Sequence, residues 1–101
     1  MKMLTLVCSE KLEDEVLVLF KDLRIKGYTV MSGAGGSGET GAVSAKFAWT
    51  KRNMIFLVAL DDAQMAKLLT AVKALHARIV EEQYGLEVPL KLFLQPCEVI
   101  L

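Results

Sequence analysis

Residues 54–79, MIFLVALDDAQMAKLLTAVKALHARI, give the clearest indication of the fold. Met54–Leu60 is the longest uninterrupted apolar run in the chain and predicts a strand. Asp61 and Asp62 follow it directly and can cap a helix. The apolar face of that helix contains Met65, Leu68, Leu69, Val72, Leu75 and Ile79. The stretch therefore predicts a strand followed by an amphipathic helix, which should end at Tyr84-Gly85.

The N-terminal part of the chain has the same order of strand and helix. Met3–Cys8 is a short apolar run that predicts a buried strand, and Ser9 is a suitable helix N-cap after it. The apolar stripe of the first helix contains Leu12, Val16, Leu19, Phe20 and Leu23. Gly27 is expected to end this helix in a left-handed conformation, and Tyr28–Met31 predicts the second strand.

A glycine-rich segment separates the second strand from the third. Residues 32–44 contain five glycines, which are too many for a helix, and the segment is too long for a tight turn. We expect a mobile functional loop here, followed by an irregular strand around Phe47 and Trp49. Leu90–Leu94, between Pro89 and Pro96, predicts the last strand.

The resulting order of elements is strand, helix, strand, loop, strand, helix, strand. This order is typical of an α+β, ferredoxin-like βαββαβ sandwich with two helices on one face of a four-stranded antiparallel sheet. Residues 1–101 are expected to form one domain of this kind. In the usual strand order, 4-1-3-2, Cys8 and Cys97 lie too far apart to form a disulfide within one subunit.

The composition excludes several classes of partner. Twelve basic and twelve acidic residues give a net charge of zero, without a basic tract that would hold nucleic acid. The longest apolar run is far shorter than the roughly 20 residues that cross a bilayer, and no signal peptide is evident, so a cytoplasmic protein is expected. Hydrophobic residues nevertheless make up 53% of the chain, which indicates that part of the apolar surface lies in a subunit interface.

The glycine-rich segment contains a motif close to a P-loop. In Gly33–Thr40 a glutamate, Glu39, occupies the place of the phosphate-binding lysine, so a P-loop nucleoside triphosphatase is not predicted. Successive glycine N–H groups can still bind a small anion, and Lys46, Lys51 and Arg52 are the cations closest in sequence. No set of residues indicates a nucleophile or an acid–base pair, so an enzyme is not expected.

Two short motifs resemble the PII family of signal-transduction proteins. The first is Gly27-Tyr28-Thr29-Val30 followed by Gly33 and Gly35, and the second is Gly85 followed by Lys91-Leu92-Phe93-Leu94. The resemblance covers nearly the whole chain. It implies a homotrimer that binds ATP, ADP or AMP in the clefts between subunits and signals through the loop after the second strand to a transporter or an enzyme.

The resemblance also implies roles for individual residues. Thr29 would contact the adenine, Val58 would line the base site, and Lys91 would meet phosphate. The backbone that approaches the phosphates would come from Gly33, Gly35, Gly36, Ser37 and Gly38, with Gly85 opening a second phosphate-facing loop. Glycines and basic residues that PII proteins carry after these points are missing, because Val88, Pro89 and Leu90 follow Gly85 and the sequence stops at Leu101.

Three phosphates would therefore be poorly neutralised, and ADP or AMP is expected to bind better than ATP. No tightly bound cofactor is expected. The chain is similar to divergent PII-like branches associated with bicarbonate transport and carboxysomes or with metal efflux, so bicarbonate on the backbone at Gly35–Gly38 is a further expectation.

Two alternatives remain open. A metal-responsive trimer resembling the CutA proteins would use Cys8, His76 or Cys97, although His76 by itself is more typical of a packed or interface histidine. A structural interaction module without a small ligand is the third hypothesis.

Overall fold

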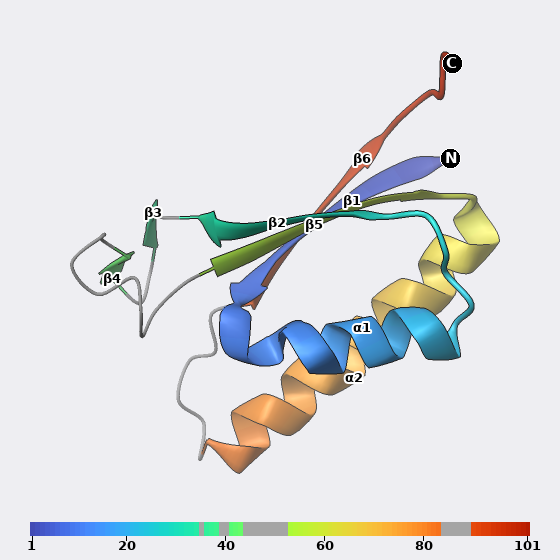
Figure 1. Cartoon of the computed structure of the whole chain (residues 1–101). Coiled ribbons are helices and arrows are strands. Elements are labelled where there is room, and N and C mark those ends of the chain that lie inside the picture. The colour runs from blue at the N-terminus through green and yellow to red at the C-terminus, as the bar shows by residue number, and fades with distance from the viewer. Residues whose placement is uncertain (35, 39–40, 44–52, 84–89) are drawn as a thin grey trace.

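The structure, a computed structural model, describes residues 1–34, 36–38, 41–43, 53–83 and 90–101. Both helices lie on the same face of one sheet, which confirms the predicted α+β class (Figure 1). The elements in chain order are β1 (Lys2–Ser9), the 3-10 helix η1 (Glu10–Leu12), α1 (Glu13–Asp22), β2 (Thr29–Ala34), β3 (Gly36–Gly38), β4 (Gly41–Val43), β5 (Asn53–Leu60), α2 (Asp62–Glu82) and β6 (Leu90–Pro96).

The main sheet has the strand order β2-β5-β1-β6, and all its neighbouring strands are antiparallel. This is the predicted ferredoxin-like order. Cys8 lies opposite Leu90 in β6, whereas the amide of Cys97 donates to the carbonyl of Met1 at the other end of β1. Both cysteines are free, so the prediction that they cannot pair within one subunit is confirmed.

The core lies between the sheet and the helices. In β1 and β5, buried and half-buried residues alternate, because successive side chains of a strand point to opposite faces. The aromatic centre of the core is Phe20, whose ring centroid lies 4.9 Å from that of Tyr28 and 5.6 Å from that of Phe56. The fully buried residues of the two strands on this face include Leu4, Leu6, Cys8 and Phe56.

Both predicted capping residues accept backbone hydrogen bonds, but Ser9 caps the 3-10 helix η1, whereas α1 follows Leu12, which makes no side-chain cap bond. The Ser9 side chain accepts a hydrogen bond from the Lys11 amide at 3.3 Å, and the Asp61 side chain accepts one from the Gln64 amide at 2.7 Å. These bonds satisfy backbone donors that have no partner within the helix. None of the helices within the described ranges is long and apolar enough to cross a membrane.

The end of α1 differs from the prediction that Gly27 terminates it. Arg24 adopts the left-handed conformation with φ of 59°. Its amide donates to the Lys21 carbonyl at 3.0 Å, and the amide of Ile25 donates to the Phe20 carbonyl at 2.8 Å. These two bonds form a Schellman motif, in which the buried Ile25 packs into the same core as Phe20. Tertiary burial of Ile25 therefore sets the helix end three residues before the glycine.

The described residues of the glycine-rich segment include two short strands. Strands β3 and β4 form a two-stranded antiparallel ribbon in which Ser37 lies opposite Ala42. The ribbon follows a register shift between Ser32 and Ala34, where Gly33 has a φ of 74°. A glycine at this conformation is typical of a β-bulge that bends the strand away from the sheet. The irregular strand expected around Phe47 and Trp49 lies outside the described residues.

Candidate functional site

One face of the sheet is not covered by any element in the described part of the chain, because both helices pack on the other face (Figure 1). Its surface is mostly apolar. Ile55 lies at its centre, between Met31 of β2 and Val7 of β1. The mostly apolar residues that share this face by strand alternation are Met3, Thr5, Val7, Met31, Ile55, Leu57, Ala59 and Phe93, and its polar residues include Thr29, Lys91 and Gln95. We call this set the open face.

The predicted adenine contacts lie at different depths. Thr29 is exposed and is paired with Leu57 across β2 and β5, so their side chains share the open face. Val58 is one residue further along, is 2% exposed and belongs to the core under the helices. The apolar side chain beside Thr29 is thus Leu57. A contact between Val58 and a base stays a prediction that its burial does not support.

The predicted phosphate contacts lie toward the other end of the sheet. Gly33 forms the bulge at the end of β2, and Gly36, Ser37 and Gly38 make up β3. Lys91 is exposed on β6, opposite Val7 on the open face. Gly35, Arg52 and Gly85 lie outside the described residues.

These two groups of residues do not meet in one subunit. Thr29 and Ala34 are the first and last residues of β2, and five strand steps of about 3.3 Å separate them by roughly 16 Å. The adenine contact and the phosphate-facing segment therefore lie at opposite ends of the same edge strand. Groups at the two ends of one edge strand can be brought together when two copies of the chain meet.

The candidate metal ligands are also separated. Cys8 is buried, Cys97 follows β6 at the far end of the sheet, and His76 is half-buried on α2. Across the described ranges, no three histidine, cysteine, aspartate or glutamate side chains are grouped so that they could hold a metal ion. Burial, with a smaller contribution from the Glu13 charge, raises the pKa of the Cys8 thiol from 9.0 to about 12.

We expect Cys8 and Cys97 to differ strongly in reactivity. At pH 8 a thiol reagent should label Cys97 readily and Cys8 at least about a hundredfold more slowly, because burial keeps Cys8 protonated and inaccessible. In the unfolded chain the Cys8 thiol loses its proton at a lower pH than in the folded protein. The free energy of unfolding should therefore also fall as the pH rises above about 9. Mass spectrometry after timed labelling checks the first expectation, with Cys97→Ser as control. Equal labelling of both cysteines in the folded protein would contradict it.

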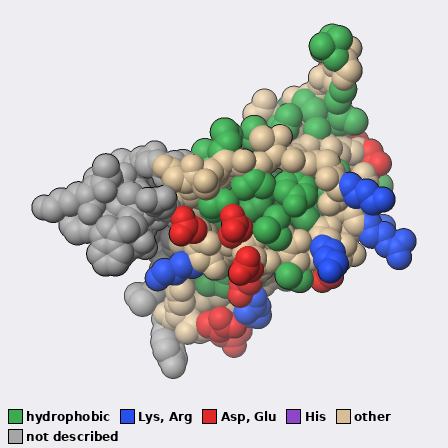
Figure 2. All heavy atoms as spheres, in the orientation of Figure 1, with side chains coloured by type: hydrophobic (Ala, Val, Ile, Leu, Met, Phe, Trp, Pro, Cys, Tyr) green, Lys and Arg blue, Asp and Glu red, His purple; other side chains and the backbone are tan. Residues whose placement is uncertain are grey.

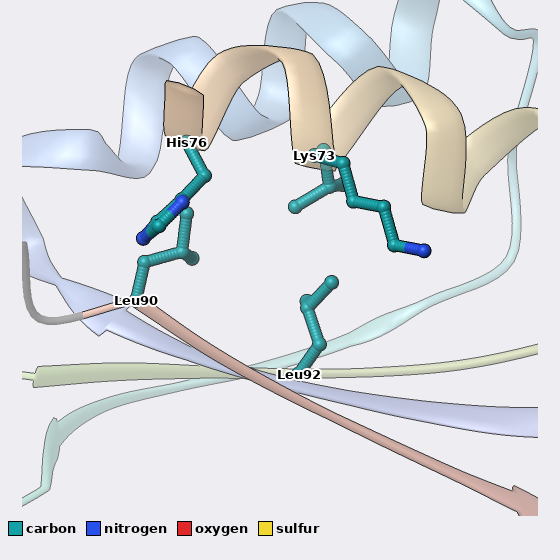
Figure 3. Close-up of a pocket in the computed structure, with 5 residues that line it drawn as sticks. Lys73, His76, Leu90 and Leu92 are labelled. Carbon is teal, nitrogen blue, oxygen red and sulfur yellow. The ribbon is translucent and has the colours of Figure 1, made fainter. Parts of the chain in front are cut away.

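A shallow pocket, which no sequence pattern predicts, lies between α2 and β6. Its volume is about 190 Å³, and the described residues that line it are Val72, Lys73, His76, Leu90 and Leu92. Lys73 and His76 extend from the helix toward the strand, and their polar ends point in different directions (Figure 3). Helical periodicity placed His76 near the apolar side of α2. Only the pairing of distant segments brings β6 beside it.

Comparisons with known proteins agree with this architecture. The family model described as nitrogen regulatory protein P-II matches residues 1–95. No curated protein sequence matches the chain. The structure of CPII, a nitrogen regulatory PII-like protein from Thiomonas intermedia K12 bound to ADP, AMP and bicarbonate, is similar with a TM-score of 0.74 at 14% identity, covering 93% of this chain and 82% of that one.

Two further solved structures share the fold. The apo form of CPII from Thiomonas intermedia K12 has a TM-score of 0.65 at 15% identity and covers 93% of this chain and 85% of that one. A protein of Thermus thermophilus assigned as PII-like has a TM-score of 0.57 at 20% identity, with 93% and 82% covered.

Proposed function

The chain belongs to the family of the nitrogen regulatory protein P-II, and on that premise we propose that it is a sensor that binds ADP or AMP at the junctions of a homotrimer. The observation that carries this proposal is the separation of the predicted contacts. Thr29 and Leu57 lie near one end of β2, and Gly33 with β3 lies at the other end. One subunit supplies the base contact and its neighbour supplies the phosphate contacts.

The open face supports the assembly. Eight mostly apolar positions share a sheet surface that lacks a covering layer among the described elements, and such surfaces mark association sites in soluble proteins. A contact between unlike surfaces of identical subunits closes into a ring when the rotation allows it. A cyclic trimer uses the same junction three times and produces three equivalent nucleotide sites.

The phosphate end favours short nucleotides. Among the described residues, we expect two kinds of hydrogen-bond donor at this end: the glycine N–H groups of β3 and the ammonium group of Lys91. Together they carry little positive charge. ADP or AMP therefore binds better than ATP. CPII, which has a similar fold, was solved with ADP, AMP and bicarbonate. In this chain bicarbonate would bind to the glycine backbone at Gly35–Gly38 beside the nucleotide.

The regulatory output would pass through the glycine-rich segment. The nucleotide contacts its first residues, so occupancy changes the surface that this segment presents to a membrane transporter. The CutA-like alternative lacks a comparable observation, since its proposed ligands are dispersed in the described structure.

Calorimetric titration with ADP, AMP and ATP, each with and without bicarbonate, tests the proposal. We expect heat with ADP and AMP, weaker binding of ATP, and a change in ADP affinity when bicarbonate is present. Absence of heat with every nucleotide at millimolar concentration would remove the proposal.

A matched pair of glycine variants tests the role of the bulge. Gly33→Ala should weaken ADP binding by about fivefold or more, because alanine at a φ of 74° costs about 1 kcal/mol and favours a different exit from β2. Gly27→Ala is the control, since a methyl group there also meets nothing within 4 Å and no positive φ is required. Equal ADP affinities for the two variants in the same titration would show that the bulge does not position the ligand.

A further inference from the structure

The pocket between α2 and β6 has an apolar base and a basic rim. Val72 is fully buried and Leu90 is 6% exposed, so both present hydrocarbon surface at the base of the pocket. Leu92, which is half-buried, extends this surface along β6. Lys73 and His76 extend from α2 over the two leucines (Figure 3; the whole surface is drawn in Figure 2). An apolar lining with a few polar groups is typical of small-molecule sites.

The basic rim has no acidic partner in the part of the chain that the structure describes. Lys73 and His76 are three residues apart, so they share one side of α2. No aspartate or glutamate lies three or four positions from either of them along the helix. Arg78 differs, because its guanidinium pairs with Glu15 at 3.2 Å and with Glu82 at 2.8 Å. The ammonium group of Lys73 is therefore available to an anion from outside the chain.

The size of the pocket limits the ligand that it can hold. Its volume of about 190 Å³ is that of roughly six water molecules in the liquid. Sites for drug-sized ligands have roughly 300–1,000 Å³, so a nucleotide is too large for this pocket. The described lining contains no carboxylate or thiolate that would hold a metal ion. The ligand that fits is small, with an apolar body and one negative end.

This pocket is separate from the nucleotide site proposed above. Successive residues of a strand point to opposite faces, so Leu90 and Leu92 face α2 while Lys91 between them lies on the open face. Association of subunits through the open face leaves the helix side of the sheet accessible. A ligand in the pocket therefore requires neither the nucleotide nor the junction between subunits.

We propose that the pocket binds a short aliphatic monocarboxylate of about four carbon atoms. The carboxylate pairs with the ammonium group of Lys73 at the rim, and the hydrocarbon chain lies on Leu90 and Leu92 beside the ring of His76. Burial of the chain favours binding, and the charged hydrogen bond selects an anion over a neutral or cationic ligand of the same shape. Because so small a ligand makes few contacts, its affinity is expected in the millimolar range.

NMR titration of the full chain with butyrate tests this site. His76 is the only histidine of the chain, so its ring signals report on the pocket without ambiguity. We expect these signals to shift saturably with butyrate at constant pH and ionic strength, and not with butylamine, which carries the opposite charge. Lys73→Met should weaken butyrate binding at least about fivefold, because it removes the ion pair. Lys67→Met is the matched control, since Lys67 is exposed on the same helix outside the pocket.

A second variant tests the place of the hydrocarbon chain. Leu92→Phe should fill the pocket and abolish the shift while the circular dichroism spectrum stays unchanged. Butyrate binding that survives this substitution would overturn the proposal. So would the absence of a saturable shift up to about 100 mM butyrate, equal shifts with butylamine, or equal affinities of the two methionine variants. Failure of ADP to bind would overturn the proposed function and leave this site intact, because the two sites lie on opposite faces of the sheet.

Discussion

Replacing Ile55 with aspartate should leave the protein monomeric and abolish ADP binding. Ile55 lies at the centre of the open face, paired with Val7 on one side and Met31 on the other. Assembly would bury the new carboxylate among apolar side chains without a partner, which costs several kcal/mol. Since the nucleotide is proposed to contact two subunits, loss of the junction also removes the binding site. We expect association and ADP affinity to fall at least about a hundredfold.

Sedimentation velocity and calorimetry on the same samples check this expectation. Val18→Asp is the matched control, because Val18 is 55% exposed on α1 and the helix lies on the opposite face of the sheet from Ile55. Circular dichroism should show that both variants keep their secondary structure. A trimeric Ile55→Asp variant with unchanged ADP affinity would show that the open face is not the junction.

The second large effect concerns the stability of the subunit. Phe20→Ala should lower the free energy of unfolding by about 3–5 kcal/mol, because it leaves a cavity in the tightly packed core. Phe20 is 1% exposed and makes edge contacts with the rings of Tyr28 and Phe56. Tyr28 and the following β2 residues, which include Thr29, would lose the surface on which this segment packs.

Urea denaturation monitored by circular dichroism measures this loss. Val18→Ala on the same helix is the control and should change the free energy of unfolding by less than about 0.5 kcal/mol, since its side chain is already exposed. A loss below about 1 kcal/mol for Phe20→Ala would contradict the central place of this ring in the core.

A nucleotide site shared between subunits also links binding to assembly. Any ligand that binds the trimer and not the monomer shifts the equilibrium toward the trimer by mass action. The Ile55→Asp variant tests this linkage, because both association and ADP binding are expected to fall together. Its monomer retains the glycine-rich segment and Lys91 of one subunit while it lacks the Thr29 of a neighbour.

Local sequence patterns were enough to predict the elements and their order. The apolar run Met54–Leu60 and the stripe that begins at Met65 predict β5 and α2, and Asp61 caps the helix as expected. These features are local, because strand and helix periodicity and capping depend on residues close together in the chain. Few sheet topologies are compatible with this order of elements along the chain. The antiparallel sheet with β1 and β5 at its centre could therefore be predicted.

Which side chains share a surface depends on the pairing of strands that are distant in sequence. A shift of one residue along a strand moves a side chain to the other face, and register pairs Thr29 with Leu57 and leaves Val58 in the core. Burial of Ile25 likewise ends α1 at Arg24 instead of Gly27. The pocket of Val72, His76 and Leu90 exists because β6 pairs with β1 far away in the sequence. Such contacts depend on long-range pairing, which local periodicity does not encode.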